Sequence, residues 1–225
     1  MVGAIAQRAA HVSMSLLFDL RVEGLENISE TGPLVIASRH YHYLWDGAAL
    51  AAATHRPLHF LVAFDWARSR VARRALESGS RLLGWPGLIR SQSIQAGHSA
   101  YRQHEVGRYA RRSWRDTLRL LERGAAVVVF PEGYPNVDPV FTVKQGGDAF
   151  LQFQPGLIRL VERAQRRGDL LVPIVPTGIR YQRGKPWRIT VRFGSPRYLT
   201  SQPIGALLAE IETEVRRLSS GSEGG

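Results

Sequence analysis

Three short and almost wholly apolar runs constrain the fold of this chain more than any other feature. They cover Leu34–Ala37, Ala125–Phe130 and Leu170–Pro176. Strands that are apolar at nearly every position are buried on both faces, which is typical of a parallel sheet with helices on both sides. Segments with helical spacing alternate with these runs, and 225 residues suit one core. The sequence therefore predicts an α/β fold, a single domain with a largely parallel central sheet and flanking helices.

The remaining elements are predicted from periodicity and from breaks at Gly and Pro. Helices are expected over residues 1–20, 47–54, 66–83, 111–122, 155–167 and 204–218, and further strands over 21–28, 57–63 and 187–193. The last of these strands alternates as an edge or half-exposed strand does. The polar segment 91–110 is expected to be a loop, and the tail 219–225 to be disordered.

The domain organisation is simple, because no linker or repeat divides the chain. Residues 1–20 are predicted to form an N-terminal amphipathic helix, and residues 21–218, which follow it, one domain. This helix either packs on the core or lies on a membrane surface. Its apolar runs are far shorter than the roughly 18 residues that a membrane span needs.

The charge balance points to an anionic partner. The chain has 30 Lys and Arg against 19 Asp and Glu, a formal net charge of +11, and only two of the cations are lysines. Anionic membrane, nucleic acid and phosphorylated substrates all attract such a chain. Nucleic acid is not expected, since no zinc-finger spacing or aromatic RNA-binding segment is present. The absence of Cys excludes disulfides, thiolate chemistry and cysteine-based metal sites.

Reactive side chains follow three of the predicted strands. His40, His42 and Asp46 come after the first apolar run, Arg90 ends the short segment 84–90, and Glu132-Gly133 follows Phe130. Each has a structural explanation, such as a helix cap, a solvated arginine or a simple turn. Sites in open α/β sheets form at the carboxyl ends of the strands, so three such ends predict one shared crevice.

A His with an orienting carboxylate predicts a general base, and two histidines compete for the role. Five residues separate His40 from Asp46, and three separate His42 from Asp46, which would place that pair one helical turn apart. A metal site built from these three residues and Glu132 has the right residue types. Its spacing matches no known signature, so no metal is expected.

Four blocks of residues together resemble the glycerolipid acyltransferase family typified by 1-acyl-glycerol-3-phosphate acyltransferases. They are Ser38-Arg39-His40 with Asp46, Gly84–Arg90, Phe130-Pro131-Glu132-Gly133, and Val172–Pro176. The resemblance spans about residues 20 to 200, which makes residues 21–218 an acyltransferase domain. Two features depart from the family pattern. The family usually has four residues between His and Asp, and it usually follows Glu-Gly with Thr-Arg or Thr-Ser where this chain has Tyr134-Pro135.

The resemblance implies transfer of a fatty acyl group from acyl-CoA or acyl-carrier protein to a hydroxyl of a glycerolipid such as lysophosphatidate. The thioester is a co-substrate, and no cofactor is implied. His40, favoured over the rival His42, would act as the base and Asp46 would orient it. Arg90 would bind an acceptor phosphate, Glu132 the acceptor hydroxyls, and backbone N–H groups around Gly133 a phosphate or oxyanion.

Such substrates lie in a membrane, so the resemblance also implies a cytoplasmic enzyme held peripherally on the inner face of the cell membrane. The candidate contacts are helix 1–20, the arginine-rich face of 66–83 and segment 99–115, with Trp85 or Trp114 at the interface. Two alternatives remain. One is an acyltransferase for a non-glycerolipid alcohol, and the other is a basic protein that binds anionic lipid or nucleic acid without catalysis.

Overall fold

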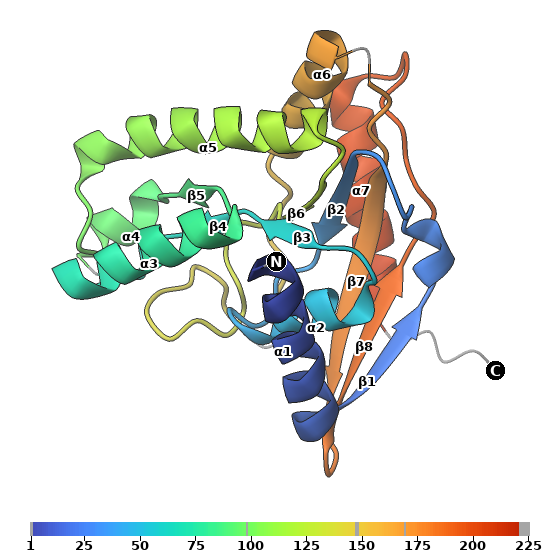
Figure 1. Ribbon diagram of the computed structural model, residues 1–225, viewed down its shortest axis with the longest axis horizontal. Helices are drawn as coiled ribbons and strands as arrows, with labels where there is room; N and C mark the ends of the chain where they lie inside the picture. Colours follow the sequence, from blue (N-terminus) through green and yellow to red (C-terminus); the bar gives the residue numbers. More distant parts are fainter. Residues whose placement is uncertain (1, 98, 147–148, 169, 221–225) are drawn as a thin grey trace.

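The computed structural model describes residues 2–97, 99–146, 149–168 and 170–220 (Figure 1). Its helices are α1 (Val2–Leu17), α2 (Trp45–Ala53), α3 (Arg70–Leu83), α4 (Ser91–Gln95), α5 (Val106–Glu122), α6 (Gly156–Gly168) and α7 (Ile204–Ser219). Its strands are β1 (Phe18–Glu23), β2 (Leu34–Ser38), β3 (Leu58–Phe60), β4 (Val62–Ala63), β5 (Gly87–Leu88), β6 (Ala126–Val129), β7 (Ile174–Gln182) and β8 (Trp187–Phe193). Two 3₁₀ turns, η1 (Leu25–Asn27) and η2 (Gln103–Glu105), complete the elements.

The central sheet has six strands in the order β1-β8-β7-β2-β6-β3. The strands β7, β2, β6 and β3 are parallel, with Ile36 opposite Val128 of β6 and Val175 of β7. The hairpin partner β8 runs antiparallel to β7, and β1 pairs in parallel with β8. The predicted single-domain α/β fold with a largely parallel sheet is confirmed.

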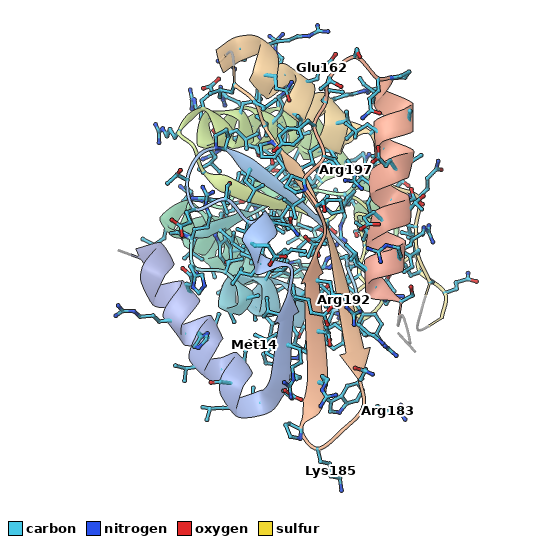
Figure 2. All side chains as sticks on the ribbon, turned by 90° about the vertical axis from the view of Figure 1, so that its right-hand side faces the viewer. Met14, Glu162, Arg183, Lys185, Arg192 and Arg197 are labelled. Carbon is cyan, nitrogen blue, oxygen red and sulfur yellow. The ribbon has the colours of Figure 1, made fainter. Side chains whose placement is uncertain are left out.

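Alternate residues of β2 explain why this strand is apolar throughout. Leu34 and Ile36 enter a core that also contains Met14 of α1 and residues of α2. Val35 and Ala37 enter a second core built with α5, α6 and α7. In Figure 2, α1, which carries Met14, and α7 lie on opposite sides of β7 and β8. The sheet is therefore covered on both faces, as a parallel sheet must be.

A smaller layer beyond β3 holds α3, α4, the two-stranded sheet β4-β5 and the first half of α5 (Figure 1). Its own core contains Phe64, Ile89 and Tyr101. Charged side chains join its helices: Arg73 bonds Glu105 through Nη1 (3.0 Å) and Nη2 (2.8 Å). These contacts order the segment 91–110, which the sequence predicted to be a loop. It contains α4 and η2, and α5 begins at Val106 rather than at residue 111.

Other predicted boundaries differ from the structure where strands pair. The helix expected over 1–20 ends at Leu17, because Phe18–Glu23 pair with β8. The strand expected over 170–176 is β7, Ile174–Gln182, whose second half pairs with β8. Strand β8 lies inside the sheet rather than at its edge, since β1 covers its other side.

The C-terminal boundary also differs from the sequence prediction. The tail was expected to begin at 219, but Ser219 is the buried last residue of α7. Residues 221–225 of the predicted tail lie outside the described residues.

The buried position of Ile36 predicts a large loss of stability on truncation. Ile36 has no exposed surface, so Ile36→Ala should lower the free energy of unfolding by about 2–5 kcal/mol. Val71→Ala is the control, because Val71 on α3 is 78% exposed and should change stability by less than about 0.5 kcal/mol. Urea denaturation followed by circular dichroism measures both. Similar small changes in the two variants would contradict the placement of β2 at the centre of the sheet.

Candidate active site

A buried carboxylate at the start of α2 organises the chain that follows β2. Asp46 has no exposed surface. Its Oδ2 atom lies 3.0 Å from His40 Nδ1 and accepts the backbone N–H groups of Tyr41 (2.6 Å) and His42 (2.9 Å). Its Oδ1 atom accepts the hydroxyl of Tyr181 at 2.7 Å. A carboxylate in the first turn also suits the helix dipole.

His40 is placed as a proton acceptor would be. Its ring stacks on Phe130 at the end of β6, with centroids 4.1 Å apart and planes 17° apart. When Nδ1–H donates to Asp46, the neutral ring carries its lone pair on Nε2. The side chain is 14% exposed and lines a large cavity. The geometry brings the predicted pair His40 and Asp46 together despite the extra residue between them.

His42, the rival base, has a different set of partners. Its Nδ1 atom accepts the backbone N–H groups of Leu44 (3.2 Å) and Trp45 (3.3 Å), so the ring caps the start of α2. Its contacts with Asp46 are made by the backbone: the His42 N–H donates to Oδ2, and the His42 carbonyl accepts the Asp46 N–H at 3.4 Å. Burial lowers the pKa of His42, although the nearby Asp46 charge opposes this. The structure therefore gives His42 the geometry of a helix cap.

The carboxylate of Glu132 contacts the backbone of His40. It is buried and accepts the N–H groups of His40 (Oε1, 2.9 Å) and Leu151 (Oε2, 3.0 Å) and the ammonium of Lys144 (Oε2, 2.6 Å). Lys144 also donates to the carbonyl of His40 at 2.7 Å and to Asn136 Oδ1 at 3.0 Å. Burial lowers the pKa of Lys144, and the Glu132 carboxylate opposes this shift. The pair thus holds both backbone polar groups of His40.

Arg90 extends from the end of β5 toward the same cavity. Its guanidinium lies against Asp65, which has no exposed surface, and Nη2 is 2.8 Å from Oδ2. Its Nη1 donates to the carbonyl of Gly133 at 2.8 Å, and the ring of Tyr134 lies 4.2 Å from Cζ.

Gly133 has φ of +76°, a conformation that favours glycine. Its N–H donates to the carbonyl of Phe130 at 3.0 Å, so a substrate contact from this group would have to replace that bond.

The cavity has a volume of about 690 Å³, within the usual range of small-molecule sites. It extends from His40 and Phe130 between α2 and α3, with Leu76, Leu83 and Trp85 in its wall. Most of the lining is apolar, including side chains from α2, α3 and β4. A cavity of this composition suits an alkyl chain whose reacting end lies at His40.

His40, Asp46, Arg90, Glu132 and Gly133 all gather at the carboxyl ends of β2, β5 and β6, as predicted.

Three further residues were missed: Asp65, Lys144 and Tyr181. Lys144 carried a usable sequence signal, since it is one of two lysines among 30 basic residues. Trp85, expected at a membrane interface, instead packs on Phe60 and donates to the carbonyl of Leu58.

Neither a metal site nor a membrane span is found in the described part of the chain. No three His, Asp or Glu side chains there could hold a metal ion, and the oxygens of Asp46 and Glu132 accept hydrogen bonds from protein groups. No described helix is both long and apolar enough to cross a bilayer.

Known proteins resemble this chain in family and in fold. A family model described as Acyltransferase matches residues 19–180, well over half of the chain. No curated protein sequence matches significantly. The fold is similar to the crystal structure of the 1-acyl-sn-glycerophosphate (LPA) acyltransferase PlsC from Thermotoga maritima, with a TM-score of 0.61 and 17% sequence identity. That alignment covers 96% of this chain and 77% of the other. At this identity the likeness shows a shared fold.

The cap formed by His42 predicts a loss of stability in mild acid. Its pKa is lowered in the folded chain, so the unfolded chain binds more protons below about pH 6.5. The free energy of unfolding should therefore fall as the pH drops below about 6.5 toward the lowered folded pKa. His42→Asn should flatten this dependence, because the amide oxygen can accept Leu44 N–H without titrating.

Urea denaturation at pH 7, 6 and 5 measures the effect. His104→Asn removes an exposed histidine of η2 and serves as the control. An equally steep pH dependence in wild type and His42→Asn would contradict the role of His42 as a neutral cap.

Proposed function

This chain belongs to the acyltransferase family and is an acyltransferase, and we propose that it moves a fatty acyl group from a thioester donor to a glycerolipid hydroxyl. The donor would be acyl-CoA or an acyl-carrier protein, and the reaction would take place at a membrane surface. One observation carries the proposal: His40, bonded to the buried Asp46, lines a largely apolar cavity of about 690 Å³. A proton acceptor thus borders an apolar space that can hold an alkyl chain.

The transfer needs no covalent enzyme intermediate. His40 Nε2 takes the proton of the acceptor hydroxyl as its oxygen attacks the thioester carbonyl. The C–S bond then breaks, and the thiolate takes the proton back from the imidazolium. Asp46 stabilises the imidazolium, and a positioned base of this kind contributes about 10²–10⁴ in rate.

Three further side chains, Tyr181, Glu132 and Lys144, support this arrangement. Burial and the Asp46 charge raise the pKa of Tyr181 far above its usual value, so the phenol remains a donor to Asp46. Glu132 and Lys144 fix the backbone of His40 on both sides. Small displacements of a catalytic group cost large factors in rate, so these contacts position the base.

The rim of the cavity supports the membrane part of the proposal. Tyr43, Leu44 and Trp66 line the cavity and yet are 49%, 51% and 39% exposed. Apolar and aromatic side chains at the entrance of a lipid site suit the interfacial region of a bilayer. The net charge of +11 favours an anionic membrane surface, consistent with a peripheral position on the inner face of the cell membrane.

The two histidines predict opposite effects on turnover. His40→Ala should lower kcat by about 10²–10⁴, because it removes the proton acceptor. His42→Asn should keep kcat within about tenfold of wild type, because the helix cap survives. Thiol release from oleoyl-CoA measures both, and circular dichroism checks that each variant is folded. An inactive, folded His42→Asn beside an active His40→Ala would assign the base to His42.

The exposed rim predicts where the chain meets a bilayer. Leu44→Ser combined with Trp66→Ser should reduce flotation with anionic vesicles by several-fold, since both side chains would leave the interface. Trp114→Ser is the matched control: Trp114 lies on α5, is 37% exposed and does not line the cavity. Equal losses in the two variants would show that charge alone, or α5, provides the contact.

A further inference from the structure

The surroundings of Arg90 bear on the class of acceptor, an inference that rests on the proposed function. Arg90 lines the same cavity as His40. To bind a phosphate monoester, an arginine offers its charge and two parallel N–H groups to the phosphate oxygens. In this chain both the charge and the parallel N–H groups are already engaged by the protein itself.

Asp65 occupies the place of an anionic ligand. Arg90 Nε lies 3.1 Å from Oδ1 and 3.0 Å from Oδ2, and Nη2 lies 2.8 Å from Oδ2. The backbone N–H of Arg90 also donates to Oδ1 at 3.0 Å. The carboxylate is fully buried, and the guanidinium side chain is only 11% exposed. The parallel N–H groups of Arg90 that could bind a phosphate are therefore bonded to the carboxylate of Asp65. The ion pair carries no net charge.

The rest of the guanidinium is also occupied. Nη1 donates to the carbonyl of Gly133, and the ring of Tyr134 covers one face. Tyr134 has only 6% of its surface exposed, so it is fixed between Arg90 and the protein. Nε and both Nη atoms thus have partners within the chain. A phosphate would have to displace some of them or accept weaker contacts at the edge.

The cavity wall offers no compensating positive charge. Among its described lining residues, Arg90 and Asp138 are the charged side chains, apart from the titratable His40. Asp138 is held in place by the N–H groups of Val140 and Phe141. Lys144, which donates to the carbonyl of His40, is buried against Glu132. A dianionic head group would leave water for an apolar cavity whose fixed charges do not favour it.

We propose that the acceptor is a lipid alcohol without a phosphate monoester, such as a monoacylglycerol. Asp65 is the specificity-determining residue, because it neutralises Arg90 permanently and removes the attraction for a phosphorylated head group. Because Asp65 already serves as the counterion of Arg90, the phosphate of a charged acceptor would remain unpaired in the site. The site therefore disfavours that acceptor. The same site leaves the hydroxyl of an uncharged acceptor free to approach His40.

The experiment compares two acceptors that differ only in the phosphate, 1-oleoylglycerol and 1-oleoylglycerol 3-phosphate, in the same neutral vesicles with oleoyl-CoA. Thiol release should give a kcat/KM at least about tenfold higher for 1-oleoylglycerol with the wild-type chain. Asp65→Asn keeps an oxygen that can accept from Arg90 but leaves the charge of Arg90 without a counterion. The ratio of the two kcat/KM values should then move toward the phosphorylated acceptor by about tenfold or more. Asp116→Asn, the same change at a surface carboxylate paired with Arg112 and Arg119, should leave the ratio unchanged.

A second variant keeps the inference testable if Asp65→Asn does not fold. Arg90→Gln with Asp65→Asn removes both charges of the pair and should retain the preference for 1-oleoylglycerol. Inorganic phosphate provides a readout independent of activity: it should raise the melting temperature of Asp65→Asn but not that of the wild type. Arg90→Gln with Asp65→Asn should also show no such shift.

Each outcome decides between the two proposals. A wild-type preference for 1-oleoylglycerol 3-phosphate, or an unchanged ratio in folded Asp65→Asn, overturns the inference and leaves the acyltransferase proposal standing. Thiol release from neither acceptor above the level of His40→Ala overturns the proposed function, and the inference falls with it.

Discussion

The carboxylate of Asp46 is the interaction on which the geometry of the site depends. It joins three parts of the fold: the residues after β2, the first turn of α2 and the distal half of β7, which contributes Tyr181. A buried carboxylate is tolerated only when its oxygens are satisfied, and here four donors satisfy it. Because the same atom, Oδ2, receives His40 Nδ1 and two backbone N–H groups, the ring and its loop are fixed together.

Two more buried carboxylates repeat this arrangement around the crevice. Glu132 holds His40 from the side of β6, and Asp65 holds Arg90 from the side of β4. Each pairs with a cation of the chain, Lys144 or Arg90, rather than facing the cavity. Breaking such a pair by removing one partner leaves a buried charge uncompensated, which typically costs about 3–5 kcal/mol. The site is consequently rigid and nearly neutral, in a chain whose surface is strongly basic.

The sequence predicted the parts of this arrangement that depend on local pattern. The apolar runs of β2 and β6 and the residues that follow them were placed correctly, since burial on both faces is visible in a few consecutive residues. Tyr181 was missed because it lies 135 residues from Asp46 and only the extension of β7 along β8 brings it there. Lys144 reaches His40 across 104 residues, and the start of α5 depends on a bond between Arg73 and Glu105. Contacts of this kind are set by tertiary structure and produce no periodic pattern in the sequence.

The stacking of His40 on Phe130 has a kinetic consequence. The ring stacks on Phe130 and is bonded at Nδ1, so in the proposed mechanism one nitrogen, Nε2, would serve both proton transfers. The proton removed from the alcohol and the proton delivered to the departing sulfur would then pass through the same atom. Because the proposed transfer forms no covalent enzyme intermediate, alcohol and thioester would have to be bound at the same time, which corresponds to sequential kinetics.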